Sequence, residues 1–329
     1  AYNAYTDALI SKNTSVLAGI TSGCSPTISV SDTRPYKPQM LHCNGCHTDN
    51  KGSIRNPGAV NVNYDVRVSS ACGTLYSTAS YQYPDISGSN QCVICHAARK
   101  SGDTIKNLNG SGVATLNFTA IPNAGGAAFR DNFDPHGFGS AGIMFGAAGY
   151  EYPVRSYANP SSFVHDKVGT PALSIDSGTN GPCVGCHMYR SGEKGNHLFT
   201  ATGKNGTGNI TSISSDVCFS ATCHPGSKSG LATVAELERV EYEDALRALC
   251  EELTDAGDAF VATPSGTCAA GLTSPYFNMA NWNSVGDAVT DGSVTGKHNA
   301  GAAMNYILLH GDEGAFVHNN KYARRLIYD

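Results

Sequence analysis

The sequence predicts a chain of mostly irregular coil with a few α-helices and short strands, packed around large groups bound to cysteine. Three observations predict this fold class. The 329 residues include 12 cysteines, and three cysteine pairs share one spacing that ends in histidine. The first two pairs lie among Gly, Asn, Ser and Thr residues, which are typical of loops. Clear helical patterns appear only toward the C-terminus, so helices alone do not account for a core.

Each of these three pairs forms the pattern C-x-x-C-H, the attachment signal of haem c. The spacing places both sulfurs on one side of a turn, within reach of the two vinyl groups of one porphyrin, and the next histidine points at the iron. Structural zinc is the alternative, but zinc gives no reason for a histidine after every second cysteine. The predicted attachment sites are Cys43, Cys46 and His47; Cys92, Cys95 and His96; and Cys183, Cys186 and His187.

A fourth site has a wider spacing. Four residues separate Cys218 from Cys223, and His224 follows directly. The two extra residues can bulge out as a loop without moving the second sulfur or the histidine, so we expect a fourth haem here. A disulfide hairpin with an incidental histidine is the alternative. The predicted fold class is therefore a multihaem cytochrome c, with irregular coil, a few helices and short strands around four covalently bound haem c groups and their irons.

The remaining histidines can supply the second axial ligands. Of the eleven histidines, four are proximal ligands, which leaves seven for four irons. A low-spin electron carrier closes both axial positions of each iron, whereas an enzyme leaves one open. Local context favours four distal ligands and one reserve, and we expect the two histidines beside a C-terminal helix to be structural. The distal candidates are His136, His165, His197 and His318; the reserve is His42; the structural pair is His298 and His310.

Four further cysteines allow three pairings. We expect Cys250–Cys268 to close a short loop after a helix, and Cys24–Cys72 to join two parts of the N-terminal region. Disulfides persist outside the reducing cytosol, and haem c is attached outside the cytoplasmic membrane. These features predict a secreted protein, extracellular or on the cell surface.

Composition argues against several partners. A net charge of −5 gives no reason to expect nucleic acid or an anionic membrane. No apolar run approaches the roughly 18 to 20 residues that cross a bilayer, so no transmembrane segment is expected. The first residues have neither a basic nor an apolar leader pattern, so we expect any signal peptide to have been removed.

Three regions are expected along the chain. Residues 1–130 carry the first two haem sites and brief strands such as 60–63, residues 131–225 carry the third and fourth sites with distal histidines, and residues 226–329 form a helical region that supplies another distal histidine. In this last region Thr233 and Glu236 have capping-box spacing and open an amphipathic helix that ends near Gly257. Two more helices are expected over 300–309 and 320–327. The apolar face of the first is expected to contain Val234, Leu237, Val240, Leu246, Leu249 and Leu253.

Several of these motifs resemble the extracellular multihaem cytochromes of metal-reducing microbes. The similar stretches run from His136 through Gly149-Tyr150-Glu151-Tyr152 and His165 to His197-Leu198-Phe199, and again over residues 305–323. With four haems, the chain resembles the tetrahaem cytochrome filament (nanowire) family of the OmcE type, over about residues 130–329. The resemblance implies stacked bis-His haems, subunits joined head to tail, and one distal histidine supplied by a neighbouring subunit. The Cys218–Cys223 spacing is a departure from ordinary haem attachment.

The predicted function is extracellular electron transfer through closely stacked bis-His c-type haems, as the repeating subunit of a conductive filament. The expected partners are copies of the chain itself and redox partner cytochromes or extracellular acceptors. The chain is expected to be an electron carrier and not an enzyme. A soluble monomeric periplasmic shuttle is the first alternative. A multihaem oxyanion reductase is the second, and the surplus of histidines argues against its open iron.

Overall fold

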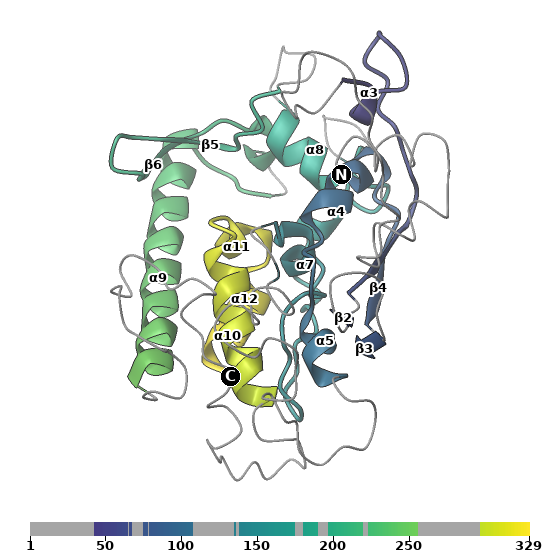
Figure 1. Ribbon diagram of the computed structural model, residues 1–329. Coiled ribbons are helices and arrows are strands. Elements are labelled where there is room, and N and C mark those ends of the chain that lie inside the picture. The colour runs from purple at the N-terminus through teal and green to yellow at the C-terminus, as the bar shows by residue number, and fades with distance from the viewer. Residues whose placement is uncertain are drawn as a thin grey trace, which may run out of the picture.

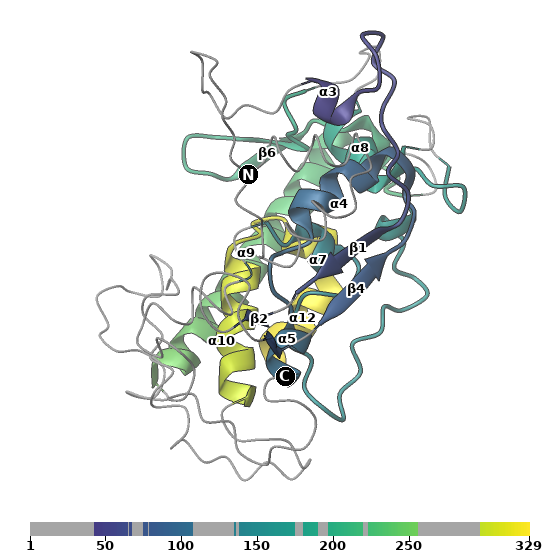
Figure 2. The ribbon, with the colours of Figure 1, turned by 45° about the vertical axis from the view of Figure 1, so that its right-hand side comes forward.

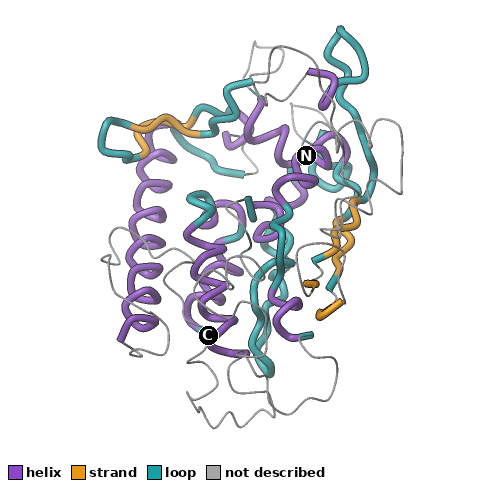
Figure 3. The backbone as a smooth tube through the Cα atoms, viewed as in Figure 1, coloured by secondary structure: helices purple, strands orange, loops and turns teal. Residues whose placement is uncertain are grey.

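The computed structural model describes residues 43–64, 66–67, 75–77, 79–107, 135, 138–174, 180–189, 197–219, 223–255 and 297–329. The C-terminal helices lie side by side in one half of the molecule, and the short helices that carry cysteine motifs gather at one end (Figures 1 and 2). Loops and turns make up much of the remaining path (Figure 3). This arrangement agrees with the predicted class of mostly coil with some helices and short strands.

The C-terminal helices enclose the main hydrophobic core. The long helix α9 (Lys228–Asp255) contacts α10 (Lys297–His310), α11 (Ala315–His318) and α12 (Asn320–Tyr328). The helices expected over 300–309 and 320–327 are confirmed as α10 and α12, each slightly longer than expected. The core also takes in side chains from earlier parts of the chain. Its members include Ile105, Ile143, Tyr150, Leu246, Met304, Leu309, Tyr322 and Leu326.

Helix α9 confirms the expected amphipathic helix, but the expected start at Thr233 is wrong. The helix begins at Lys228, and Ser227 Oγ accepts a hydrogen bond from the Gly230 N–H at 3.0 Å, as an N-terminal cap does. Glu236, the expected partner in a capping box, instead accepts the backbone N–H of Ile210 at 2.7 Å. The capping residues are therefore inside the helix, and one of them holds a neighbouring strand.

The buried face of α9 also differs from the expected one. Leu246 and Leu253 are buried as expected, whereas the expected core residues of the first turns are exposed. The first turns contact strand β6 (Ile210–Ile213), and polar side chains make part of that contact. Tyr242 and Cys250 join the buried face further along. The exposed residues are Val234, Leu237 and Val240.

Cys250 is fully buried on α9 and is disulfide-bonded. Its expected partner Cys268 lies outside the described residues, as do Cys24 and Cys72. Both disulfide pairings therefore stay predictions, and so does the division of the chain into three regions.

The part of the chain before residue 190 consists of short elements. The strand expected at 60–63 is confirmed as β1 (Val60–Asn63), which pairs antiparallel with β4 (Ser80–Tyr83). Beyond β1, the Tyr64 hydroxyl donates to the carbonyl of Ala97 at 2.8 Å and lies 2.7 Å from the Tyr83 hydroxyl. Both hydroxyls are buried, so the hairpin is held to the residue that follows His96. Helices α5 (Gly102–Lys106) and α7 (Ser140–Met144) pack nearby.

Two other antiparallel pairs complete the described strands. β2 (Val66–Arg67) pairs with β3 (Leu75–Ser77), and β5 (Thr202–Lys204) pairs with β6, each with an irregularity in register. Within the ranges described, no helix is long and apolar enough to cross a membrane.

Candidate haem-binding sites

The predicted attachment motifs lie on or beside short helices at one end of the molecule (Figures 1 and 2). The first motif forms α3 (Cys43–Cys46), with His47 directly after it. The second ends α4 (Asn90–His96), and the third lies within α8 (Gly181–Met188). A short helix places the two sulfurs and the histidine of each motif close together. The local structure therefore agrees with the chemistry that the spacing predicts.

The fourth motif begins in a 3-10 helix, η4 (Asp216–Phe219), which contains Cys218. All eight cysteines of the four motifs are free thiols. Cys218 and Cys223 are therefore not joined by a disulfide, and the alternative of a disulfide hairpin has no support at this site.

Three motif histidines face three histidines from outside the motifs. The ring centroids of His47 and His197 are 6.0 Å apart. Those of His187 and His318 are 6.1 Å apart. Those of His165 and His224 are 6.3 Å apart. Each pair joins one predicted proximal ligand to one predicted distal ligand.

An ordinary aromatic contact is the other explanation for such distances, because ring pairs commonly lie 4.5–7 Å apart. Chance contact does not explain why each of these three contacts joins a motif histidine to a predicted distal histidine. His298 and His310, which we expected to be structural, pack on tyrosines instead. His298 lies between Tyr150 and Tyr152, and His310 stacks on Tyr306 at 5.6 Å.

His96 is the remaining motif histidine, and His136, the remaining distal candidate, lies outside the described residues. Pro135 and Phe138 are held against the chain that follows His96. The Ala98 N–H donates to the Phe138 carbonyl, and the Arg99 N–H donates to the Pro135 carbonyl, each at 2.9 Å. The Phe138 ring meets the His96 ring edge-on at 5.4 Å.

Several ligand candidates are oriented through their Nδ1 atoms. His187 Nδ1 lies 2.9 Å from the Phe199 carbonyl, and His165 Nδ1 lies 2.6 Å from the Val317 carbonyl. His318 Nδ1 lies 2.7 Å from the Asp312 carboxylate. A hydrogen bond at Nδ1 fixes the tautomer and leaves Nε2 free to bind a metal.

Burial lowers the pKa of His96, His187 and His224. Burial disfavours the charged imidazolium, so these rings are held in the neutral form at neutral pH. Only the neutral imidazole has a nitrogen lone pair free for a metal. The electrostatic surroundings therefore suit iron ligation.

Exposed apolar side chains flank the same histidines. Leu198 is 68% exposed and Phe199 is 50% exposed, both directly after His197. Exposed apolar groups gathered at one place mark a surface that another apolar body covers, and a porphyrin is such a body. This observation supports the fit of haem to the site. The full set beside the predicted ligands is Phe138, Val164, Leu198, Phe199 and Val317.

The four motifs lie next to one another in chain order. Cys46 is close enough to Cys92 for their charges to interact, and the Cys92 and Cys183 side chains are in hydrogen-bonding contact. Cys186, at the other end of the third motif, has the same electrostatic proximity to Cys218 and Cys223. The third motif therefore links the second to the fourth.

Ser89 explains how α4 and α8 are brought together. Its hydroxyl donates to the Asn180 carbonyl at 2.7 Å and accepts the Val184 N–H at 3.0 Å. Ser89 is fully buried directly before α4, and its two partners lie at the start of α8. One side chain thus aligns the helices that carry the second and third motifs.

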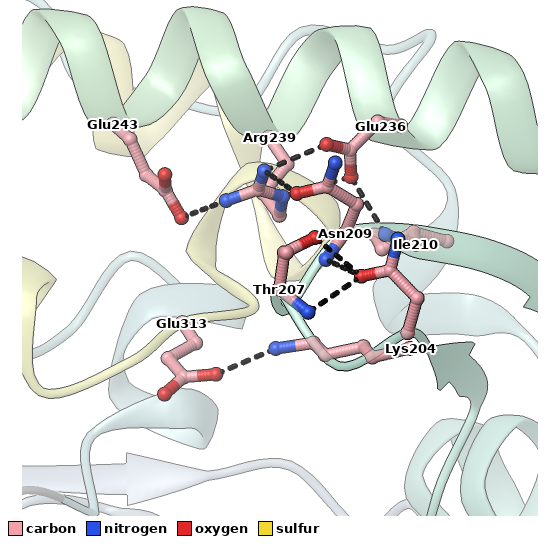
Figure 4. Close-up of polar contacts among 9 residues, drawn as sticks. Lys204, Thr207, Asn209, Ile210, Glu236, Arg239, Glu243 and Glu313 are labelled. Atoms are coloured by element: carbon pink, nitrogen blue, oxygen red, sulfur yellow. Dashed lines mark hydrogen bonds and ion pairs between the residues drawn. The ribbon is translucent and has the colours of Figure 1, made fainter.

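The hairpin β5–β6 connects His197 and Phe199 to the fourth motif, and α9 anchors it (Figure 4). Glu236 receives the Ile210 N–H at 2.7 Å and also pairs with Arg239 at 2.7 Å. Arg239 in turn pairs with Glu243. Lys204, on β5, bonds to Glu313 at 2.8 Å, ahead of α11. Lys204 and Ile210 face each other beside the turn of the hairpin, so these contacts hold both of its strands to the C-terminal helices at that end.

Sequence reasoning missed the groups that orient the histidines. Asp312 lies six positions before His318, a spacing that matches no motif. The carbonyls of Phe199 and Val317 have no signature in sequence, because every residue has a carbonyl. Among the described residues, no three His, Cys, Asp or Glu side chains gather as a metal site made of protein ligands alone.

Two kinds of relative are similar to the chain over most of its length. The C-type polyheme cytochrome OmcB of Geobacter sulfurreducens is 38% identical over 306 residues, which are 88% of this chain and 37% of that protein. The C-type polyheme cytochrome OmcC of the same organism is 38% identical over 304 residues, 91% of this chain and 37% of that protein. The chain thus spans little more than a third of the relatives that it matches. No family model and no solved structure matches the chain.

Proposed function

We propose that the chain binds four haem c groups in a row and transfers electrons along them. One observation carries the proposal: three motif histidines each lie opposite a histidine from outside the motifs. The distances between the ring centroids are 6.0, 6.1 and 6.3 Å. Two imidazoles on opposite faces of one metal, each bound at about 2 Å, have ring centroids roughly 6 Å apart. The similarity to C-type polyheme cytochromes supports haem c as the group that these residues hold.

The proposed ligand pairs follow from these contacts. His47 pairs with His197, His187 with His318, and His224 with His165; His96 and His136 form the fourth pair by elimination. Cys43 and Cys46, Cys92 and Cys95, Cys183 and Cys186, and Cys218 and Cys223 hold the porphyrins through thioether bonds. Haem c supplies one-electron transfer between the ferrous and ferric states of its iron. If two of these histidines bind each iron, no position would stay open for a substrate, so we expect the chain to be an electron carrier and not an enzyme.

We propose that electrons pass through the four haem sites in the order of the motifs along the chain. The Cys92–Cys183 contact, and the electrostatic proximity of Cys46 to Cys92 and of Cys186 to Cys218, support a single row in which the sites follow the chain from first to fourth. The chain's own residues keep this row rigid: Ser89 aligns α4 with α8, and the β5–β6 hairpin is fixed to α9. Rigid spacing matters because electron tunnelling weakens steeply as the gap between donors and acceptors grows.

The finer proposal is a filament subunit of the OmcE type, located outside the cell, with copies of the chain as neighbours and redox cytochromes or extracellular acceptors as partners. It rests on the motif resemblance, and the disulfide bond of Cys250 supports the location outside the cytoplasm. Electron microscopy of native, haem-stained material tests it. Regular haem-positive fibres are expected, and small particles alone would leave a soluble shuttle.

The core proposal is tested by intact-mass measurement after expression with a haem c attachment system. Four haems are expected, and three would exclude the Cys218–Cys223 site. Replacement of His165, His197 or His318 by alanine, one at a time, should each convert one low-spin haem to high spin in the EPR spectrum. His298→Ala is the matched control, because this histidine packs on Tyr152, and its spectrum should stay fully low-spin.

A further inference from the structure

Asp312 is a buried carboxylate that no sequence motif predicts. Its side chain is 6% exposed and lies in the turn between α10 and α11. One oxygen is 2.7 Å from His318 Nδ1, and the other accepts the Gly314 N–H at 3.1 Å. The Ser140 side chain is a third hydrogen-bond partner. A buried carboxylate with this many partners is held in one orientation.

The turn is built around this contact. Backbone bonds from Ala315 to the Asp312 carbonyl and from His318 to the Gly314 carbonyl, at 3.0 and 2.8 Å, fold the chain back so that residues 312 and 318 meet. A Cβ at Gly314 would lie 2.8 Å from His318 Cε1. The absence of a side chain at position 314 therefore lets the imidazole approach the turn closely.

The other oriented histidines have neutral acceptors. His187 and His165 each face a backbone carbonyl, whereas His318 faces a carboxylate. Among the described residues, His318 is the proposed ligand histidine that pairs with a carboxylate. The charge of Asp312 also acts on His96 and His187. The one buried negative charge of Asp312 thus acts on two neighbouring proposed sites, those of His96 and His187.

We infer that Asp312 is a positioning residue that makes the iron held by His187 and His318 the most difficult of the four to reduce; this inference rests on the proposed function. A carboxylate that accepts the Nδ1 proton increases the electron donation of the imidazole to the metal. It also places a fixed negative charge near the iron, where low polarity leaves it poorly screened. Both effects favour the ferric state and lower the reduction potential of this site.

The test is spectroelectrochemistry of the full chain with all haems attached. Asp312→Asn keeps the shape and removes the charge, so the most negative component of the titration should move to a more positive potential. Asp312→Glu should restore most of the wild-type value. Ser140→Ala removes a hydrogen-bond donor to the carboxylate and should shift the potential of the same component slightly to a more negative value. Glu313→Gln is the matched control: it removes one charge at the adjacent residue, which is exposed and pairs with Lys204.

The outcomes separate the two ideas. One outcome is that wild-type protein carries low-spin bis-imidazole haems while neither Asp312→Asn nor Ser140→Ala changes the reduction potential of any haem. In that case the inference about Asp312 is wrong and the proposed function stands. If Glu313→Gln moves the potential as much as Asp312→Asn, general charge and not the His318 contact is responsible, which also overturns the inference. If wild-type protein lacks bis-imidazole haems, the proposed function itself fails. Should Asp312→Asn not accumulate, Ser140→Ala alone decides, because it leaves His318 and its partner in place.

Discussion

The proposed site of His187 and His318 and the proposed site of His47 and His197 would use the same kind of ligand in different surroundings. His318 is almost buried, with Asp312 on its Nδ1, and His187 faces the Phe199 carbonyl. His197 is exposed on a loop, and Cys43 is exposed as well. Within the described part of the chain, His47 Nδ1 is buried and has no hydrogen-bond partner. One site belongs to the packed interior, and the other lies at the periphery.

The difference teaches that one attachment motif can serve sites of different character. The motif supplies two sulfurs and one imidazole, but the surrounding fold decides how firmly the second imidazole is oriented and what charge lies behind it. A partner at Nδ1 tunes a metal ligand, and hydrogen bonds and burial change a haem's potential. We therefore expect the interior site to be the more rigid of the two and the lower in potential.

The largest effect is expected from removal of the second imidazole at each site. His318→Ala leaves the Asp312 carboxylate buried without its main partner, which costs about 3–5 kcal/mol of unfolding free energy. His197→Ala removes an exposed side chain and should cost less than about 1 kcal/mol. Chemical denaturation followed by the haem spectrum measures both. Equal losses in the two variants would break the contrast between interior and periphery.

A smaller effect is expected from Gly314→Ala. The new Cβ would lie 2.8 Å from His318 Cε1, so the imidazole must tilt, at a cost of about 1–3 kcal/mol. The EPR signal of one low-spin haem should shift while the others stay unchanged. Gly206→Ala is the control, since an added Cβ there meets nothing within 4 Å. An unaltered EPR spectrum in Gly314→Ala would mean that the turn does not constrain His318.

The smallest effect concerns the peripheral side, where Glu236 holds the hairpin that follows His197. Hydrogen bonds from Arg239 and the Ile210 N–H lower the pKa of Glu236 to about 2. An unfolded glutamate titrates near pH 4.3, so the stabilisation is complete above about pH 4.3 and is lost as the pH falls toward 2. The melting temperature of Glu236→Gln should therefore approach that of the wild type as the pH decreases through this window.

Glu251→Gln, an exposed glutamate on the same helix, is the reference for this experiment. A difference between wild type and Glu236→Gln that stays constant from neutral pH down to 2 would show that the carboxylate charge does not anchor the hairpin.

The helices at 300–309 and 320–327 could be predicted from periodicity. The attachment cysteines and the distal histidines stay predictions, and three of the distal candidates lie beside motif histidines in the structure. The start of α9 was not predicted correctly. Ser227 caps the helix in place of Thr233, and Glu236 bonds to a strand that is distant in sequence. Asp312 was not found either. Its role arises from a turn that brings residues 312 and 318 together, and no local sequence pattern predicts that turn.

The contact between Cys92 and Cys183 has a consequence for biogenesis. The two thiols belong to different attachment sites, and both are free until haem is joined to them. In an oxidising compartment, two thiols held in contact can oxidise to a disulfide. Such a bond would block the second and third sites together. If these two sites bind haem as proposed, the chain would have to receive both haems before it folds tightly, or its thiols would have to be kept reduced until attachment. The timing of assembly would then matter most at these two sites.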